Sequence, residues 1–213
     1  YDWPLQTGQK SRGTALLVHG LGEHMGRYAH VAQHFNQWGF SVRGYDHFGH
    51  GLSTGVRGGL LSDNQLLDDL DVMLLQARQN MPANEKLVLV GHSMGGGVVG
   101  RFVSMHPERV DALVMSSPAL DGGLNAIQKL LLSTLPKIAP NLRVGNGLDP
   151  RFISHDESMV AAYTSDPLVH DRISARLGRF IVNNGAEVIA SASNWRVPTL
   201  LMFAGQDKLV SPA

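Results

Sequence analysis

The chain has 213 residues, no cysteine, and 18 basic against 18 acidic side chains, so its formal net charge is zero. This length fits one large domain or one domain with an insertion, and the 43% hydrophobic content allows a sizeable core. The lack of cysteine excludes disulfides, thiol catalysis and cysteine-based metal sites, and the neutral charge gives no support to nucleic-acid binding. No apolar run is long enough to cross a membrane, and the first residues do not resemble a signal peptide.

Short apolar runs alternate with segments of helical periodicity along most of the chain. We expect strands over 14–18, 40–45, 86–90, 110–115 and 199–204, and helices over 27–38, 64–80 and 97–106. The runs are apolar throughout rather than at every second residue, which is typical of a parallel sheet covered on both faces. The predicted fold class is therefore α/β, with a mostly parallel, doubly wound sheet. Ligands of such sheets bind beyond the carboxyl ends of the strands.

The stretch over 118–197 interrupts this alternation and is too long for a simple crossover. Helical patterns at 124–138, 156–163 and 173–183 indicate a helical cap, or lid. We expect this cap to be inserted into a core domain formed by 1–117 and 198–213, and to cover a site at the carboxyl edge of the sheet. The apolar side of its first helix suggests an acyl chain or another greasy group, but a helix that merely packs on the core would have the same pattern.

The sequence Gly91-His92-Ser93-Met94-Gly95 joins an apolar strand to a helix-forming segment. A serine on such a sharp turn projects beyond the carboxyl edge of the sheet, which makes the G-x-S-x-G pattern informative here. The turn strains the backbone of the serine, and the two glycines remove side chains that would collide across it. The N–H of Met94, at the start of the helix, can face a developing oxyanion. The alternative is a glycine-rich turn that merely contains a serine.

Four further motifs accompany this turn. They are His19-Gly20-Leu21-Gly22-Glu23-His24 with Arg27-Tyr28, Asp46-His47-Phe48-Gly49-His50-Gly51-Leu52-Ser53, Tyr163-Thr164-Ser165-Asp166-Pro167-Leu168, and Gly205-Gln206-Asp207-Lys208-Leu209-Val210. With the serine motif they make the chain resemble the α/β-hydrolases, and within them the monoacylglycerol lipase and lysophospholipase group. The match covers nearly the whole chain, and the combination is far more specific than G-x-S-x-G alone.

The resemblance implies a role for each of four positions. Ser93 is the expected nucleophile and Asp207 the expected acid of a Ser-His-Asp triad. Leu21 and Met94 would supply the two N–H groups of the oxyanion hole. In such a triad a histidine takes the proton of the serine, and the carboxylate holds that histidine in the right tautomer.

The resemblance also implies a polar pocket that binds the glycerol head of the substrate, at Glu23, Arg27, His92 and Tyr163. Each position has a simpler interpretation that stays open. Glu23 and Arg27 could form a salt bridge that fixes the loop and the first helix, and His92 could be a packing residue. The loop that contains Asp46 is expected to be structural, because the chain order in this fold is serine, acid, histidine.

The triad histidine is the one element that departs from the pattern, since no histidine follows Asp207. His155 and His170 lie in the expected cap, where the fold does not place the triad histidine. We therefore expect the triad histidine C-terminal to Ala213, on a missing segment with the last strand and the last helix. A chain that truly ended at Ala213 is expected to show no meaningful turnover.

The predicted function is that of a serine carboxylic-ester hydrolase acting on monoacylglycerols, lysophospholipids or similar acyl esters. One alternative is another serine α/β-hydrolase, of the aminopeptidase or haloperoxidase type; another is a non-catalytic binding protein that keeps the pocket without the histidine. Ser93 argues against epoxide hydrolases and dehalogenases, which usually carry aspartate at that turn.

No cofactor or metal is expected, because acyl transfer needs neither and the histidines do not fall at metal-ligand spacings. The expected partner is a small acyl ester or lipid, with no nucleic acid. The expected location is the cytoplasm, with peripheral membrane contact through the lid as the alternative, although the chain lacks a basic stripe to support it. Acyl length, head group and oligomeric state are not encoded in these patterns.

Overall fold

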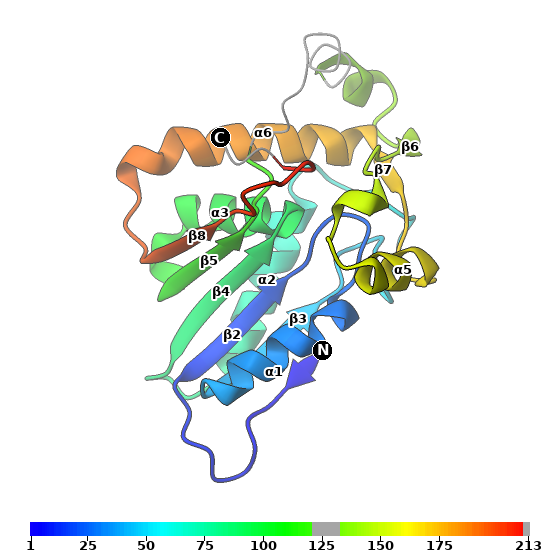
Figure 1. Ribbon diagram of the computed structural model, residues 1–213. Coiled ribbons are helices and arrows are strands. Elements are labelled where there is room, and N and C mark those ends of the chain that lie inside the picture. Colours follow the sequence, from blue (N-terminus) through cyan, green and yellow to red (C-terminus); the bar gives the residue numbers. More distant parts are fainter. Residues whose placement is uncertain (121–132, 211–213) are drawn as a thin grey trace.

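The computed structural model describes residues 1–120 and 133–210. At its centre is a six-stranded sheet with the strand order β1-β3-β2-β4-β5-β8 (Figure 1). All neighbouring pairs are parallel except β1 with β3. The strands are β1 (Asp2–Trp3), β2 (Gly13–Val18), β3 (Phe40–Tyr45), β4 (Lys86–His92), β5 (Ala112–Ser116) and β8 (Thr199–Met202). The five predicted parallel strands are confirmed, whereas the short antiparallel β1 was not predicted.

Helices lie on both sides of this sheet (Figure 1). One side carries α2 (Gln65–Gln79), α3 (Met94–Met105) and α6 (Ala175–Ser191), and the other carries α1 (Ala29–Gln37). The side chains of the first three helices share one hydrophobic cluster with β2, β4 and β5, and those of α1 share a second cluster with β2 and β3. The predicted doubly wound α/β arrangement is therefore confirmed.

The register of the strands separates the two clusters. Leu16 pairs with Leu89, and Leu89 with Leu113, so these three side chains share one face of the sheet. All three are almost fully buried beneath α2 and α3. This face holds the larger of the two clusters.

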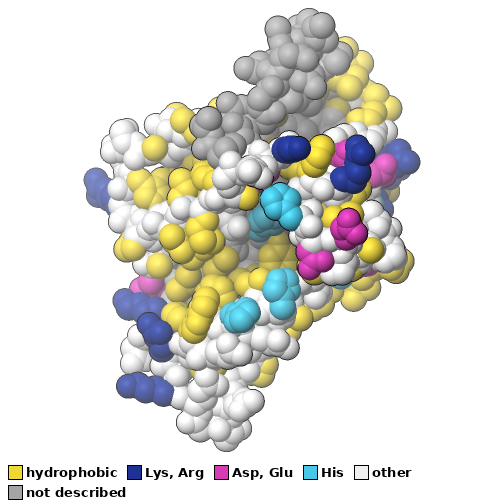
Figure 2. Space-filling model, in the orientation of Figure 1, with side chains coloured by type: hydrophobic (Ala, Val, Ile, Leu, Met, Phe, Trp, Pro, Cys, Tyr) yellow, Lys and Arg dark blue, Asp and Glu magenta, His cyan; other side chains and the backbone are white. Residues whose placement is uncertain are grey.

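The opposite face is covered less completely. Leu17, Val90, Val114 and Leu200 form a row across four strands on this face. Leu17 lies beneath α1 and is 1% exposed, whereas Leu200, at the far end of the row, is 54% exposed. Figure 2 shows apolar side chains gathered on this side of the molecule. Among the described α-helices, α1 is the one that shares this face's cluster, together with Met25 of the short 3-10 helix before it.

The helix boundaries differ from the predictions in two informative places. The helix expected from residue 97 begins at Met94, directly after Ser93. The helix expected over 173–183 begins at Ala175 and continues to Ser191. The sequence Asn183-Asn184-Gly185 favours an end there, but a side chain at Gly185 would overlap the backbone of Leu120. Gly185 is therefore explained by close packing against Leu120, and it does not end the helix.

The region predicted to be the cap contains the helix α5 (Glu157–Ser165) and a small antiparallel pair, β6 (Arg143–Gly145) with β7 (Arg172–Ser174). The helix predicted over 124–138 falls partly on residues outside the described ranges, and residues 133–138 are helical. The division into core and cap stays a prediction. The helix α6 packs against α3 and adds Leu177 and Phe180 to the main cluster of the core. A cap that ends before Ala175 therefore agrees with the packing better than one that ends at residue 197.

The leucines of α2 provide a matched test of this packing. Leu70 is fully buried and Leu75 is 45% exposed on the same helix. We expect Leu70→Ala to lower the free energy of unfolding by about 2–5 kcal/mol, because it leaves a cavity, and Leu75→Ala to lower it by less than about 1 kcal/mol. Urea denaturation followed by circular dichroism measures both values. Equal losses in the two variants would contradict the assigned faces of α2.

Candidate active site

Ser93 occupies the turn between β4 and α3, with φ 52° and ψ −120°. Few non-glycine residues adopt a positive φ, and here the surrounding backbone holds it. The N–H of Ser93 donates to the carbonyl of Ser116 at 3.0 Å, and the carbonyl of Ser93 accepts from Gly97 at 3.1 Å and Ala119 at 2.9 Å. The predicted strained turn is therefore present.

The two glycines of the serine motif are required by close backbone approach. A Cβ on Gly91 would overlap the carbonyl oxygen of Gly95, and a Cβ on Gly95 would overlap the carbonyl oxygens of Val18 and His19. The start of α3 thus lies directly against the end of β2. This contact brings the serine turn beside the loop that follows β2.

The loop after β2 carries the first expected oxyanion donor. A Cβ on Gly20 would lie 3.2 Å from Cβ of Ser93, so the loop and the nucleophile are adjacent. Leu21 follows Gly20 and packs against the main hydrophobic cluster. Met94, the second expected donor, is the first residue of α3, where backbone N–H groups have no partner within the helix. The structure therefore brings both candidate donor segments to Ser93.

Asp207 lies in a turn shortly after β8. Its Oδ1 accepts from the N–H groups of Leu209 and Val210, each at 2.9 Å. Partial burial would raise the pKa of Asp207, but these two N–H groups, the hydroxyl of Ser117 and the proximity of His92 together lower it. The carboxylate is thus held ionised beyond the carboxyl end of the strand, as a triad acid requires.

The four positions expected in the polar pocket also come together. Oε2 of Glu23 is 3.3 Å from Nε of Arg27, and the Arg27 guanidinium lies 4.8 Å from the ring centre of Tyr163. Nδ1 of His92 lies 3.1 Å from the carbonyl oxygen of Ser116, which places this ring on the same sheet edge.

Glu23 is the centre of this group, and its carboxylate contacts other residues of the same loop and of the segment that follows it. Oε1 accepts from the N–H of Gly20 at 2.8 Å and from the hydroxyl of Tyr28 at 2.7 Å. Burial would raise the pKa of Glu23, but the nearby His92 and His19 and these hydrogen bonds lower it. The structural interpretation of the Glu23–Arg27 pair therefore has direct support, because the pair fixes the loop that carries Leu21.

Three contacts join the cap segment around α5 to the same loop. Nε2 of His24 lies 2.8 Å from Oδ2 of Asp166. The N–H of His170 donates to the carbonyl of Gly22 at 2.8 Å, and the Tyr163–Arg27 contact is the third. None of these follows from the sequence pattern, although Asp166 stands in a motif that the resemblance singled out.

Asp46 has the contacts of a structural residue. Its carboxylate accepts from the N–H groups of Met25 at 2.7 Å and Leu52 at 2.8 Å, and it is 8% exposed. Asp46 therefore closes the loop after β3 on itself and ties it to the segment at Met25 that follows β2. This agrees with the expectation that the loop after β3 is structural.

A groove of about 1050 Å³ begins at the group formed by Glu23, Arg27 and His92, and it extends along the less covered face of the sheet. Its polar end contains Glu23, Arg27 and His92, and its cap side contributes Ile153 and Met159. The rest of its lining is mainly apolar and comes from the sheet row and from α1. It therefore joins a polar pocket to an apolar channel.

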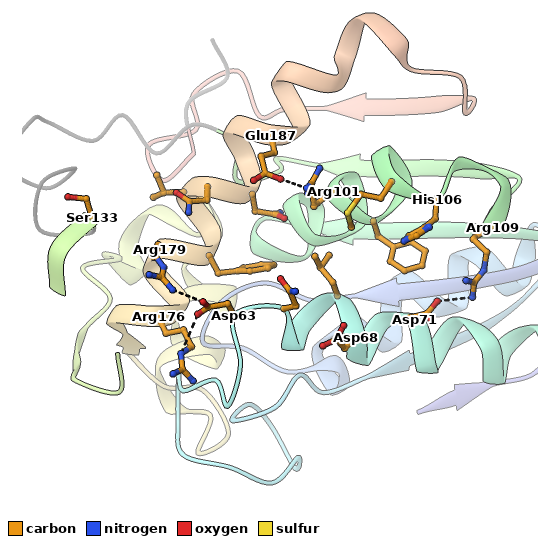
Figure 3. A pocket seen from close by; sticks show the side chains of 18 of the residues that line it. Asp63, Asp68, Asp71, Arg101, His106, Arg109, Ser133, Arg176, Arg179 and Glu187 are labelled. Atoms are coloured by element: carbon orange, nitrogen blue, oxygen red, sulfur yellow. Dashed lines mark hydrogen bonds and ion pairs between the residues drawn. The ribbon is translucent and has the colours of Figure 1, made fainter. Parts of the chain in front are cut away.

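A second cavity, of about 970 Å³, lies between α2, α3 and α6 on the opposite side (Figure 3). Most of its charged side chains pair with one another: Arg109 lies 2.8 Å from Asp71, and Arg179 lies 2.7 Å from Asp63. Arg101 pairs with Glu187 in the same way.

In residues 1–120 and 133–210, no group of three or more His, Cys, Asp or Glu side chains is arranged to hold a metal ion. Within the same ranges, every helix is too short or too polar to cross a lipid bilayer.

The sequence did not predict the roles of two residues in the site region, His19 and Ser117. His19 was seen only as part of a motif, yet its ring bridges the loops after β2 and β3. Ser117, with φ 39°, has a second strained backbone and lies near Asp207. The hydrophobic periodicity of the sequence does not predict such contacts, because they depend on how loops that follow different strands meet in the folded chain.

Comparison with protein families gives a match over residues 9–213 to the hydrolase model described as "Serine aminopeptidase, S33". Among curated proteins, a monoacylglycerol lipase from Mycolicibacterium smegmatis is 36% identical over 205 residues, which span 95% of this chain and 72% of that protein. The phospholipase YtpA of Bacillus subtilis is 30% identical over 92% of this chain and 76% of its own length.

Solved structures give the same picture. The monoacylglycerol lipase of Paleococcus ferrophilus superposes with a TM-score of 0.84 at 36% identity, covering 95% of this chain and 76% of that one. A soluble variant of the monoglyceride lipase of Saccharomyces cerevisiae, in complex with a substrate analogue, gives a TM-score of 0.88 at 24% identity over 99% of this chain and 74% of that one, which supports the fold.

The close approach at Gly95 yields a direct test. We expect Gly95→Ala to lower the melting temperature and to displace Ser93, because the added Cβ has no space beside Val18 and His19. Gly145→Ala is the matched control, since the nearest atom to its Cβ would be 3.9 Å away. Thermal denaturation of the two variants measures the difference. A wild-type melting temperature for Gly95→Ala would show that the turn is not packed as described.

Buried histidines make a second test possible. Burial lowers the pKa of His47 and of His50 well below 6.5, and it lowers the pKa of His170 to about 4. Because the unfolded chain then binds protons that the native state does not, we expect the free energy of unfolding to fall as the pH drops from 7 to 5. Urea titrations across this range measure the slope.

His50→Gln should reduce that slope, because it removes one of the buried titrating rings. His30→Gln, on the exposed side of α1, should leave it unchanged. A free energy of unfolding that stays constant or rises between pH 7 and 5 would contradict the burial of these rings.

Proposed function

The chain belongs to the serine aminopeptidase (S33) family of α/β-hydrolases, and on this premise we propose that the protein is a serine carboxylic-ester hydrolase of monoacylglycerols, lysophospholipids or similar acyl esters. The observation that carries the proposal is the strained serine turn, with two candidate N–H donors beside it. The names of the relatives support an ester as the substrate, since two of them are lipid-ester hydrolases.

In the proposed reaction, Ser93 attacks the ester carbonyl and forms an acyl-enzyme. The N–H groups of Leu21 and Met94 stabilise the negative charge on the carbonyl oxygen, an effect worth about 3 kcal/mol for each donor in measured cases. A histidine takes the serine proton and returns it to the leaving alcohol, and water then releases the acid. Asp207 orients that histidine and stabilises its charged form.

The triad histidine is part of this proposal rather than of the described structure. Among the described residues beyond Asp207 there is none, and the sequence ends at Ala213 without one. We assign the histidine to the intact protein, in the chain order serine, acid, histidine.

The groove supports the substrate class. Its polar end, at Glu23, Arg27 and His92, suits the hydroxyl groups of a glycerol head, and its apolar lining suits an acyl chain. Exposed apolar side chains of the cap region, including Phe152 and Met159, would let the lid touch a lipid surface. Membrane contact is therefore proposed together with the lipid substrate.

The family description makes an aminopeptidase the second candidate. Such an enzyme needs a free carboxylate for the substrate amine. Two carboxylates line the groove, those of Glu23 and Asp166. Glu23 already accepts from Gly20 and Tyr28 and pairs with Arg27, and Asp166 pairs with His24. This observation favours the ester hydrolase.

Replacement of the nucleophile is the first test. In the intact protein, we expect Ser93→Ala to abolish hydrolysis of a p-nitrophenyl ester, with a loss of at least about 10⁴-fold in kcat, because no acyl-enzyme can form. Ser104→Ala, near the end of the same helix, should keep wild-type rates. Retained turnover in Ser93→Ala would remove Ser93 from the reaction.

Substrate choice is the second test. We expect hydrolysis of monoacylglycerols and lysophospholipids at rates that exceed those for amino-acid anilides by at least about 100-fold, because no carboxylate of the pocket is free for an amine. Fatty-acid release and anilide cleavage are measured on the same preparation. Faster anilide cleavage would support the aminopeptidase instead.

A further inference from the structure

Gly20 is held from two sides, once through each of the two peptide units to which it belongs. The N–H of Gly20 donates to Oε1 of Glu23 at 2.8 Å. The carbonyl oxygen of Gly20 lies 2.7 Å from Nδ1 of His19. Both polar groups of Gly20 therefore have a buried or half-buried side-chain partner.

The tautomer of His19 follows from its second contact. The backbone N–H of His47 donates to Nε2 of His19 at 3.0 Å, so Nε2 must carry the lone pair. The proton of the neutral ring then sits on Nδ1 and is donated to the carbonyl of Gly20. The ring is fully buried, and burial lowers the pKa of His19, which keeps this neutral form.

Peptide geometry connects this hydrogen bond to the reaction. In a trans peptide unit the carbonyl and the following N–H lie in one plane and point in opposite directions. The carbonyl of Gly20 and the N–H of Leu21 belong to the same unit. A partner that fixes the direction of the carbonyl therefore also fixes the direction of the N–H, beside Ser93.

We propose that His19 is a positioning residue, which aims the Leu21 N–H at the oxyanion through the Nδ1–H hydrogen bond to Gly20. This inference rests on the proposed function, in which Leu21 is an oxyanion donor. His19 does not touch the substrate in this account. Its contribution is to remove the rotational freedom of one peptide, which would otherwise have to be lost during each reaction.

Two amide substitutions separate this role from simple packing. In His19→Asn the side-chain N–H₂ can take the place of Nδ1–H, whereas in His19→Gln the amide reaches the place of Nε2 instead. We expect His19→Asn to keep kcat within about tenfold of wild type. We expect His19→Gln to lose roughly 100-fold in kcat with little change in KM, as when one oxyanion donor is removed.

The experiment measures kcat and KM for ester hydrolysis by the intact protein, with His106→Asn as the control, because this exposed histidine at the C-terminal end of α3 does not line the groove. Equal losses in the two His19 variants would overturn the proposal in favour of packing. A change confined to KM would also overturn it, because an oxyanion donor acts mainly in the transition state.

A spectroscopic measurement judges the inference without turnover. Nitrogen-15 NMR of the histidine rings should show His19 protonated at Nδ1 and bare at Nε2 between pH 6 and 8. A proton on Nε2 would overturn the proposal even in an active enzyme. Conversely, a wild-type protein with the expected tautomer and no esterase activity would refute the proposed function alone.

Discussion

The site depends on one steric constraint, the contact between the start of α3 and the end of β2. Gly95 has no room for a side chain because the carbonyl oxygens of Val18 and His19 lie directly against it. This contact places Ser93 beside the loop after β2, and hydrogen bonds to Ser116, Gly97 and Ala119 hold its unfavourable backbone angles. The strain of 1–3 kcal/mol that such a residue typically costs is offset by the packed core around it.

The same loop is also the meeting point of the core and the cap region. Its Glu23 accepts from Gly20 and pairs with Arg27, and its His24 contacts Asp166. Glu23 and Arg27, which were expected to bind the substrate, are thus also residues that fix the loop after β2. A substrate bound against Arg27 or Tyr163, as proposed, would contact groups already linked to the candidate oxyanion donor, and binding and catalysis would then depend on the same contacts.

Much of the framework could be predicted from the sequence, because buried parallel strands are continuous apolar runs and the serine turn has a pattern with a steric cause. The full length of α6 could not, since Gly185 resembles a helix end until its contact with Leu120 is known. The roles of His19 and Ser117 could not either, because both depend on loops that meet only in the folded chain. Pairing of strands as short as β6 and β7 leaves no periodic signal.

The most direct measurement of the central claim is the site of covalent modification by a fluorophosphonate. The intact protein is incubated with the reagent, digested, and the modified peptide is identified by mass spectrometry. The account predicts one adduct, on Ser93, since this is the serine that, among residues 1–120 and 133–210, combines a strained turn with adjacent candidate N–H donors. An unmodified Ser93 in a preparation that hydrolyses esters, or an adduct on another residue, would contradict it.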